Sequence, residues 1–562
     1  MNGMMTGIGG TAMDGTTAGG CMTAMAGRTA VIIGGGMGGL ITGALLSRLG
    51  CRVTVLEKNS NVGGGLQTFR RAGAEFSPGM HLVGGRDGGA AVALLRMIGV
   101  DVRLKSCPMT TVLQGVMPEK GGSCADSTAG RSFEQFSIPQ GTEAFYNCFA
   151  ARFPGSAAQL RRYLDRMQEI CDSVPLLRTG SAASAHSEEC GLTAMFDDGR
   201  LLSYVPDGDA LMPADEFVAK YISDPRLRTV LGWLNPLTGS IPGVTPAYVH
   251  AIINVLYISG SSQFAGGTKP IARQLVRIIE SSGGEVKAGC AATGILVGKD
   301  VSGCGLPEVR ALNGTHGFAR GVQASDGNLY TADTYISAIN PSALAALCPQ
   351  DAFPKVFRRR LAAQKPGISM FCLYIKLKDD VQAKADGIVD SRGTDASGVA
   401  KFILDGGFGC EWQPWGEILY VRDGDAVTLM APMSCEEVSR WKGTAHGHRP
   451  KEYGRWLAER TEQLLERIEW SEPGFRSRIE ACWSASPLTF SDFLGDPDGA
   501  VYGFRIDSSS PAYSRFGPKT YLRNLYMTGQ NAGLHGLCGV SMSSVLTVRA
   551  ILDDVKSFNA IG

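Results

Sequence analysis

The first regular pattern of hydrophobic residues in the chain predicts a strand, a helix and a second strand. Thr29–Ile33 is a short, mostly β-branched run that ends abruptly in glycines, as a buried parallel strand does when it enters a tight turn. Residues 40–49 are largely apolar on all sides and stop at Gly50, which readily terminates a helix. Arg52–Leu56 is then typical of a second strand, so the pattern predicts one strand–helix–strand unit.

The glycines of this unit have the spacing G-x-G-x-x-G, and an acidic residue, Glu57, ends the second predicted strand. In such a unit the first glycine permits the turn, the second lets the backbone approach a pyrophosphate, and the third lets the helix pack on the strand. The helix N-terminus faces the phosphates, and the carboxylate accepts ribose hydroxyls. The unit therefore predicts a bound dinucleotide. Its expected contacts are Gly34, Gly36, Met37, Gly38, Gly39, Glu57 and Lys58.

Three later patterns predict further elements of the same kind. Residues 271–281 form an amphipathic helix that is followed by a short strand at Val286. Residues 321–339 contain strands around a hairpin turn at Asp326-Gly327. Near the C-terminus, Leu525–Met527 predicts an apolar strand that ends in a polar turn, after which a helix runs to about Asp553.

Composition and charge narrow the class of protein. The 562 residues are 44% hydrophobic, which is enough to bury more than one core, so two domains are expected. The 54 Lys and Arg residues balance 53 Asp and Glu residues, so nucleic acid is not an expected partner. The 15 cysteines are scattered without a C-x-x-C pair, which disfavours a disulfide scaffold or a zinc site. They suit a reducing compartment, so we expect a cytoplasmic protein without a metal site.

The N-terminal residues and the hydropathy bear on targeting. Residues 1–28 lack a continuous apolar segment, so we expect a disordered leader rather than a secretory signal. No stretch has the roughly 18 consecutive apolar residues that a membrane-spanning helix needs. The chain is therefore not expected to span a membrane.

The residues after Glu57 distinguish between dinucleotides. A second glycine cluster at residues 63–65 resembles the double-glycine extension of the flavin amine oxidase and phytoene desaturase superfamily, although Gly65 replaces the usual basic residue. The turn after residue 527 resembles the C-terminal flavin motif of that superfamily, with Gln530 in place of the common Asp. The resemblance implies FAD as the cofactor. The contacts that it adds are Gly64, Gly65, Thr68, Val286, Gly529, Gln530, Gly539 and Val540.

Shorter segments resemble particular members of this superfamily. Residues 74–84, 486–489, 502–503 and 528–530 resemble retinol saturases and carotenoid isomerases in the same order. Residues 78–81 and 487–489 argue against an amine oxidase, which shares the FAD motifs. The resemblance implies an oxidoreductase that saturates or desaturates a C=C bond of a long apolar polyene, such as an isoprenoid, retinoid or carotenoid, by hydride transfer at flavin N5.

Two alternatives stay open at this point. One is a redox-neutral, FAD-dependent isomerase or hydratase of polyenes or unsaturated fatty acids. The other is a non-catalytic protein that binds flavin or lipid. No second G-x-G-x-x-G follows a strand, so the electron donor is unknown.

The separated motifs predict interleaved domains and an α/β fold. A Rossmann-type FAD-binding domain is expected from three chain segments, namely residues 29–105, 262–345 and 510–562. Residues 106–261 and 346–509 are expected to form a substrate-binding domain with a mixed sheet and helices.

Three residues are candidates for the proton donor that a C=C reduction needs. His81 and His535 lie in segments that should approach the flavin, and histidine donates protons near neutral pH. Tyr502 is the third, because a phenol can protonate a developing carbanion. For each of these three residues, a structural role beside the cofactor is an interpretation that stays open next to the catalytic one. The apolar residues 230–258 are expected to form core and pocket, and we hypothesise that some of them contact a membrane peripherally.

Overall fold

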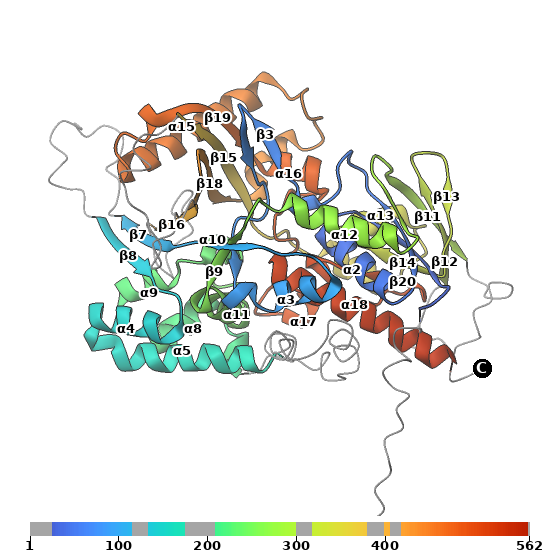
Figure 1. Ribbon diagram of the computed structural model, residues 1–562, viewed down its shortest axis with the longest axis horizontal. Coiled ribbons are helices and arrows are strands. Elements are labelled where there is room, and N and C mark those ends of the chain that lie inside the picture. Colours follow the sequence, from blue (N-terminus) through green and yellow to red (C-terminus); the bar gives the residue numbers. More distant parts are fainter. Residues whose placement is uncertain are drawn as a thin grey trace, which may run out of the picture.

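A five-stranded parallel sheet organises one half of the protein (Figure 1). The computed structural model describes residues 25–114, 133–174, 208–298, 317–378, 398–404 and 417–559. The strand order is β10-β2-β1-β14-β20, and every pairing is parallel. The strands are β1 (Thr29–Ile33), β2 (Arg52–Leu56), β10 (Glu285–Lys287), β14 (Thr334–Ser337) and β20 (Leu525–Met527). Three distant regions of the chain therefore build one sheet.

Alternate residues of the central strand β1 enter two different cores. Ala30 and Ile32 pack with four helices on one face of the sheet. These helices are α2 (Met37–Arg48), α3 (Gly89–Ile98), α12 (Lys269–Ser281) and α18 (Gly536–Asn559). Val31 and Ile33 pack on the opposite face. Each buried aliphatic side chain stabilises the fold by about 1.5–3 kcal/mol relative to an exposed one.

A small antiparallel sheet and two helices cover that opposite face. They are β11 (Ala292–Gly298), β12 (Phe318–Ala324), β13 (Leu329–Tyr330), α13 (Pro341–Leu347) and α14 (Lys355–Ala362). The turn between β12 and β13 contains Asp326 and Gly327, which confirms the predicted hairpin. A parallel sheet has to be covered on both faces, and this one is.

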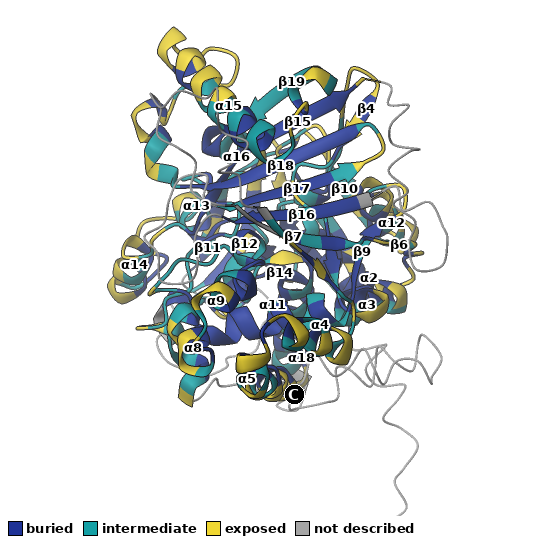
Figure 2. Ribbon diagram, turned by 90° about the vertical axis from the view of Figure 1, so that its left-hand side faces the viewer, coloured by how far each residue is buried: buried dark blue, intermediate teal, exposed yellow. Residues whose placement is uncertain are grey.

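A seven-stranded mixed sheet organises the other half of the protein. Its order is β19-β15-β18-β17-β16-β7-β8, in which only the pairing of β16 with β7 is parallel. The strands are β7 (Met109–Gln114), β8 (Phe133–Ile138), β15 (Ser369–Leu377), β16 (Gly398–Leu404), β17 (Glu417–Asp423), β18 (Ala426–Met433) and β19 (Ile479–Ala485). Figure 2 shows its strands largely buried between outer helices.

Helices cover both faces of the mixed sheet. On one face α15 (Lys451–Ser471) buries Trp456, Leu464, Leu465 and Ile468, as the sequence predicts. The other face packs against a helical layer. That layer contains α4 (Thr142–Arg152), α5 (Ala157–Asp172), α8 (Ala214–Tyr221), α9 (Pro225–Leu231), α10 (Asn235–Thr238) and α11 (Ala247–Ser259). The α/β class with a parallel Rossmann-like sheet and a mixed sheet is confirmed, whereas the domain boundaries stay a prediction.

Short elements connect the two halves. They are the strands β3 (Phe69–Arg71), β4 (Ala74–Phe76), β5 (Val83–Gly84), β6 (Leu104–Ser106) and β9 (Ser261–Phe264), and the helices α16 (Pro487–Leu494) and α17 (Pro511–Ser514). β3 pairs with β4, and β9 lies between β5 and β6.

Two expectations about the ends of the chain need adjustment. Residues 1–24 of the predicted leader lie outside the described residues, but residues 25–28 are not disordered, since they form a turn in which Met25 is fully buried. At the C-terminus, residues Gly536–Lys556 of α18 are long and apolar enough to cross a membrane. However, 67% of that apolar window is buried inside the protein, where α18 packs on α2 and α3. Its composition is therefore explained by the core.

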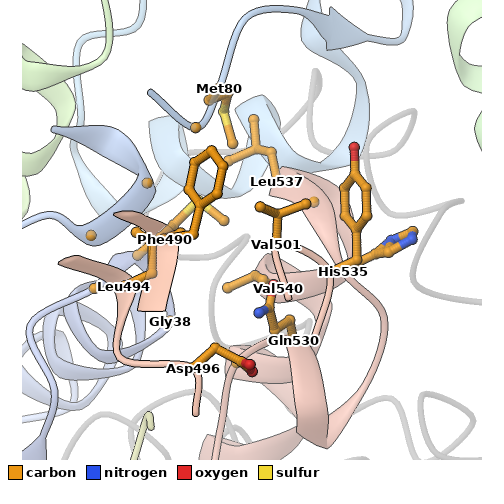
Figure 3. A pocket seen from close by; sticks show the side chains of 18 of the residues that line it. Gly38, Met80, Phe490, Leu494, Asp496, Val501, Gln530, His535, Leu537 and Val540 are labelled. Atoms are coloured by element: carbon orange, nitrogen blue, oxygen red, sulfur yellow. The ribbon is translucent and has the colours of Figure 1, made fainter. Parts of the chain in front are cut away.

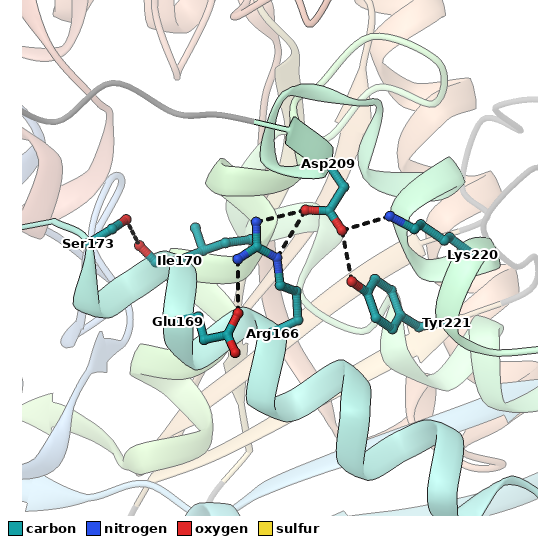
Figure 4. A network of polar contacts seen from close by, with 7 residues as sticks. All are labelled: Arg166, Glu169, Ile170, Ser173, Asp209, Lys220 and Tyr221. Carbon is teal, nitrogen blue, oxygen red and sulfur yellow. Dashed lines mark hydrogen bonds and ion pairs between the residues drawn. The ribbon is translucent and has the colours of Figure 1, made fainter.

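The helical layer is tied together by the carboxylate of Asp209 (Figure 4). Asp209 lies in the short 3₁₀ helix η7 (Gly208–Leu211) and accepts hydrogen bonds from Arg166 of α5 at 3.0 and 2.8 Å. Its other oxygen accepts from Lys220 at 2.9 Å and from Tyr221 at 2.8 Å, both on α8. Burial raises the pKa of Asp209, but these hydrogen bonds outweigh burial and lower it to about 2.

We expect Asp209→Asn to lower the free energy of unfolding by about 1–2 kcal/mol, because it removes charge-assisted hydrogen bonds from a partly exposed site. The folded-state pKa of Asp209 lies below the ordinary value of 3.8. The difference in the free energy of unfolding between variant and wild type is therefore largest above pH 4 and shrinks as the pH falls toward 2. Urea denaturation followed by circular dichroism measures it. Glu169→Gln is the control, because Glu169 pairs with the same Arg166 but its side chain is 65% exposed. Equal effects of the two variants would contradict the prediction.

Candidate functional site

One large cavity lies where the parallel sheet faces the mixed sheet. Its volume is about 570 Å³. Residues at or just beyond the carboxyl ends of four parallel strands line it, namely Ile33, Leu56, Ala338 and Thr528. Residues of the mixed sheet line it as well, namely Met370, Cys372, Leu419 and Met430. Open parallel sheets bind their ligands at this edge.

The glycine turn after β1 leads into the cavity. Gly34 has a φ of 102°, which favours glycine, and its N–H donates to the Leu56 carbonyl at 2.8 Å. Gly36 is the N-cap of α2, where no side chain caps the first turn. Gly36, Met37 and Gly38 all line the cavity. The uncapped N–H groups and the positive end of the helix dipole therefore form an anion site there.

Gly39 differs from the other glycines of this turn because it serves the packing of α2 on β1. A Cβ on Gly39 would lie 2.0 Å from the Gly34 carbonyl oxygen and 3.2 Å from the Ala338 side chain. Gly39 does not line the cavity. It lets α2 pack directly on the end of β1, which is the role that the motif predicts for its third glycine.

Further glycines bring distant turns against the start of α2. The Gly63 N–H donates to the Gly35 carbonyl at 2.7 Å. A Cβ on Gly64 would lie 3.0 Å from Gly36 Cα, and a Cβ on Gly38 would lie 2.9 Å from Gly529 Cα. The predicted contacts Gly36, Gly38, Gly64 and Gly529 therefore meet as bare backbone beside the cavity. Gly65 also lines the cavity and contacts Gly79.

The acidic residue of the predicted unit lies at the same edge. Glu57 is buried and lines the cavity. Its carboxylate accepts the Gly35 N–H at 2.7 Å and the Asn59 N–H at 2.9 Å. A carboxylate has about four acceptor positions, so two positions are left for ribose hydroxyls.

The C-terminal turn contributes Gln530 to the same cavity (Figure 3). Gln530 lines the cavity, and its amide, oriented to satisfy both partners, donates to the Val501 carbonyl at 3.2 Å and accepts from the Gly503 N–H at 3.1 Å. The Gln530 side chain therefore fixes this turn to residues 501–503. Helix α18 begins next to it, and its residues Gly536, Leu537, Cys538 and Val540 line the cavity. Two helix N-termini thus face one cavity.

Three predicted contacts do not line the cavity, and a fourth, Lys58, lines it with its ammonium bonded elsewhere. Thr68 is directed at Glu75, and its hydrogen bond contributes to lowering the pKa of that carboxyl. Val286 pairs with Val55 in the sheet and does not line the cavity, although Ala291 and Ala292 do. Gly539, like Gly39, is a packing position, because its Cβ would lie 2.4 Å from Leu534. Lys58 lines the cavity, but its ammonium donates to the Asp492 carbonyl at 3.0 Å.

Two of the three candidate proton donors contact each other. The rings of Tyr502 and His535 have centroids 4.7 Å apart, and both residues line the cavity. His535 Nε2 lies 2.6 Å from the Thr238 carbonyl, so Nε2 carries the proton and donates it. The Tyr502 hydroxyl donates to the Pro236 carbonyl at 2.7 Å, and burial raises its pKa above the ordinary value. Each is thereby fixed to the segment that contains α10.

Burial changes the protonation of the two candidate histidines. It lowers the pKa of His81 to about 4 and that of His535 to about 4. Both imidazoles are therefore neutral at pH 7 and do not hold the extra proton that a histidine acid would donate. His81 lines the cavity apart from the Tyr502–His535 pair, and its Nε2 is buried without a hydrogen-bond partner among the described residues.

The chain is similar to known proteins both in its N-terminal dinucleotide unit and over nearly its full length. A model of an NAD(P)-binding Rossmann-like domain matches residues 32–97. All-trans-retinol 13,14-reductase of Rattus norvegicus is 25% identical over 546 residues, which cover 93% of this chain and 85% of that protein. This chain is a distant homologue of the retinol saturases over nearly its full length.

Two other relatives widen the range of activities around the retinol saturases. Prolycopene isomerase 2 of an Oncidium hybrid cultivar is 22% identical over 493 residues, or 84% of this chain and 75% of that protein. An inactive all-trans-retinol 13,14-reductase of Danio rerio is 22% identical over 550 residues, or 93% and 85%. Among solved structures, putrescine oxidase bound to putrescine has a TM-score of 0.58 at 13% identity and covers 94% of this chain and 99% of its own. That likeness is one of fold.

Sequence reasoning missed much of the apolar wall of the cavity. Of the predicted apolar residues 230–258, Leu231, Trp233 and Leu234 are core, whereas Ile253, Leu256 and Tyr257 line the cavity. The wall also contains Met80, Phe490, Leu494 and Val501 (Figure 3), together with the mixed-sheet residues, and the acidic side chain of Asp496 lines the cavity as well. Strand β15 is buried along its whole length, so its sequence carried no sign of which side chains face a ligand.

Two alanine substitutions separate the ligand-facing glycine from the packing glycine. At Gly36, where φ is −74°, an added Cβ meets only Gly64 Cα at 3.9 Å and otherwise enters the cavity. We expect Gly36→Ala to fold normally and to bind its dinucleotide at least about tenfold more weakly, because the methyl group occupies the approach to the helix N-terminus. Gly39→Ala is expected to lower stability even without ligand, because its Cβ overlaps the Gly34 carbonyl. Thermal denaturation and equilibrium dialysis measure the two effects, and wild-type affinity in Gly36→Ala would overturn the assignment.

Proposed function

We propose that this chain is an FAD-dependent oxidoreductase that acts on a C=C bond of a long apolar polyene. The observation that supports it most is the composition of the one cavity. Two helix N-termini and bare glycine backbone form one end, and aliphatic, Met and aromatic side chains form the other. Such a cavity suits a dinucleotide next to an uncharged substrate.

The residues at the polar end fit FAD. The uncapped start of α2 and the glycine junctions suit a pyrophosphate, and Glu57 suits the adenosine ribose. The turn at Gln530 and the start of α18 suit the flavin end, because a positive helix end stabilises an anionic reduced ring. FAD, when bound, supplies the capacity to donate or accept a hydride.

The chain's own residues then bind, orient and exclude water. The buried wall keeps the reacting part of a polyene away from solvent, and the neutral imidazoles of His81 and His535 add no charge to it. His535 and Tyr502 hold the α10 segment against the C-terminal turn through the carbonyls of Thr238 and Pro236. Of the three sequence candidates, we propose Tyr502 as the proton donor, because its phenol holds a proton at neutral pH, whereas the neutral imidazoles lack the extra proton of a histidine acid.

A redox-neutral isomerase is the second candidate function. The relative that is named a prolycopene isomerase matches 84% of this chain, and one apolar cavity serves isomerisation as well as saturation. A non-catalytic binding role is the third, because one relative is named inactive. The electron donor is left open in each case. A cytoplasmic location and peripheral membrane contact also stay proposals, and flotation with liposomes tests the second.

The mass of the product distinguishes these functions. We expect the purified protein to show a flavin spectrum and, after anaerobic photoreduction, to be reoxidised by a polyene that gains two hydrogens. All-trans-retinol is the first probe, and the oxidised protein with the same probe is the matched control, in which a loss of two hydrogens reports desaturation. An unchanged mass with a shifted double bond supports the isomerase. A reduced flavin that no polyene reoxidises, with an unaltered polyene, contradicts both catalytic functions.

Tyr502→Phe tests the proton donor. We expect turnover to fall by about 10²-fold or more while the flavin spectrum and the bound FAD are unchanged, because only the hydroxyl is removed. Tyr257→Phe is the matched control, since Tyr257 lines the same cavity and its hydroxyl also donates to a backbone carbonyl, that of Leu82 at 3.1 Å. Equal turnover in the two variants would show that Tyr502 only lines the cavity.

A further inference from the structure

The C-terminal end of helix α16 lies beside the acidic residue that suits the adenosine ribose. Phe493 and Leu494 are the last two residues of α16, and both line the cavity. The side-chain amide of Asn59, two residues after Glu57, donates to the Phe493 carbonyl at 2.9 Å. This hydrogen bond joins a helix of the mixed-sheet half to the end of strand β2 in the parallel sheet. The end of α16 is therefore held next to Glu57.

The turn after α16 is bound to a second element of the parallel sheet. Asp496 and Asn340 both line the cavity, and the Asn340 amide donates to Asp496 Oδ2 at 2.8 Å. Asn340 is the N-cap of α13, which follows β14. Asp496 Oδ1 accepts from the N–H groups of Asp498 and Ala500 at 3.0 and 3.1 Å, which fixes the turn. Since β1 lies between β2 and β14, residues 493–496 form a strap from one neighbour of β1 to the other.

The strap carries two large apolar side chains that are unusually exposed. Phe493 is 50% exposed and Leu494 is 38% exposed, whereas Leu488 and Phe490, earlier in the same helix, are buried. The ring of His446 packs edge-on against Phe493 with the centroids 5.4 Å apart. Figure 3 shows Leu494 along the wall of the cavity. Apolar side chains that are exposed along a cavity are typical of positions that contact a ligand.

Small and apolar residues of the parallel-sheet half border the same region. The Cys290 N–H donates to the Glu57 carbonyl at 2.8 Å, and the next two residues, Ala291 and Ala292, line the cavity. Leu347, at the end of α13, lines it as well. The space next to Glu57 is therefore bordered by apolar side chains from three elements. Such a slot suits an uncharged planar ring better than a phosphate.

We infer that Phe493 and Leu494 contact the adenine base of the dinucleotide, so that the mixed-sheet half of the chain takes part in cofactor binding. The inference rests on the FAD of the proposed function and names the residues that hold its base. The base is attached to the ribose that Glu57 suits, which brings it next to the end of α16. An apolar side chain against the face of a base stabilises binding, because both surfaces are removed from water.

The strap also connects the base to the apolar end of the cavity. Helix α16 packs on strands β15 and β19 of the mixed sheet. Strand β15 contains Met370 and Cys372, which line the apolar end. A dinucleotide that is held by α16 therefore stabilises the half of the protein that lines the apolar end as well as the parallel sheet.

Leu494→Ala and Phe493→Ala test the contact through binding rather than turnover. We expect each variant to bind FAD and ADP about tenfold more weakly than the wild type, because both ligands contain adenine and lose an apolar contact. FMN contains the flavin and one phosphate but no adenine, so its affinity should change by about twofold or less. Equilibrium dialysis of the full-length protein measures the three affinities. Leu329→Ala is the matched control, because Leu329 is 49% exposed and does not line the cavity.

Two results would overturn the inference. One is wild-type affinity for ADP in both alanine variants. The other is an equal loss of affinity for FAD and FMN, which indicates a general disturbance of the site. Phe493→Leu keeps an apolar contact and should restore most of the ADP affinity, which a general disturbance would not explain. If one alanine variant does not fold, the other variant and Phe493→Leu decide, and the ADP measurements decide if FMN binds too weakly to measure.

The outcome is independent of the catalytic proposal. Loss of ADP affinity in the variants without any change in polyene mass by the wild type supports the base contact and rejects the enzyme. Polyene turnover by the wild type with unchanged ADP affinity in both variants rejects the base contact and supports the enzyme.

Discussion

Contact between glycine backbones at the start of α2 is the constraint on which the rest of the site depends. Gly36 touches Gly64, and Gly38 touches Gly529, with no room for a Cβ at Gly38 or Gly64. These contacts join turns from three distant parts of the chain at one point. They also leave the first N–H groups of α2 without a capping side chain, so the close packing and the anion site have the same cause.

Burial acts on the other end of the cavity in one consistent direction. It lowers the pKa of His81 and of His535, and it raises the pKa of Tyr502. Each shift favours the neutral form, because a charged group loses hydration when it is enclosed by apolar side chains. The apolar end is thus suited to uncharged ligands and to chemistry by neutral donors. The ion pairs of Asp209, by contrast, lie in the outer helical layer, where the side chains of Arg166 and Lys220 stabilise the charged carboxylate.

The elements that could be predicted from the sequence are those whose signal is local. The strand, turn and helix after Thr29 follow from a β-branched run, the glycine spacing and an apolar stretch, and in the structure α2 begins at Met37. The polar turn before α18 was recognisable in the same way. Thr68 and Val286 were placed by resemblance to a motif, and neither lines the cavity, since Thr68 bonds to Glu75 and Val286 is paired with Val55 inside the sheet.

The sequence by itself determined the class of fold, the dinucleotide unit and the glycines that meet around it, because each depends on spacing within a short segment. The motif spacing also separated the ligand-facing Gly36 from the packing Gly39, whereas only the tertiary structure showed that Gly539 packs against Leu534. It alone brought His535 next to Tyr502. The protonation states of these two side chains come from burial by residues far away in the chain, and no local pattern carries that information.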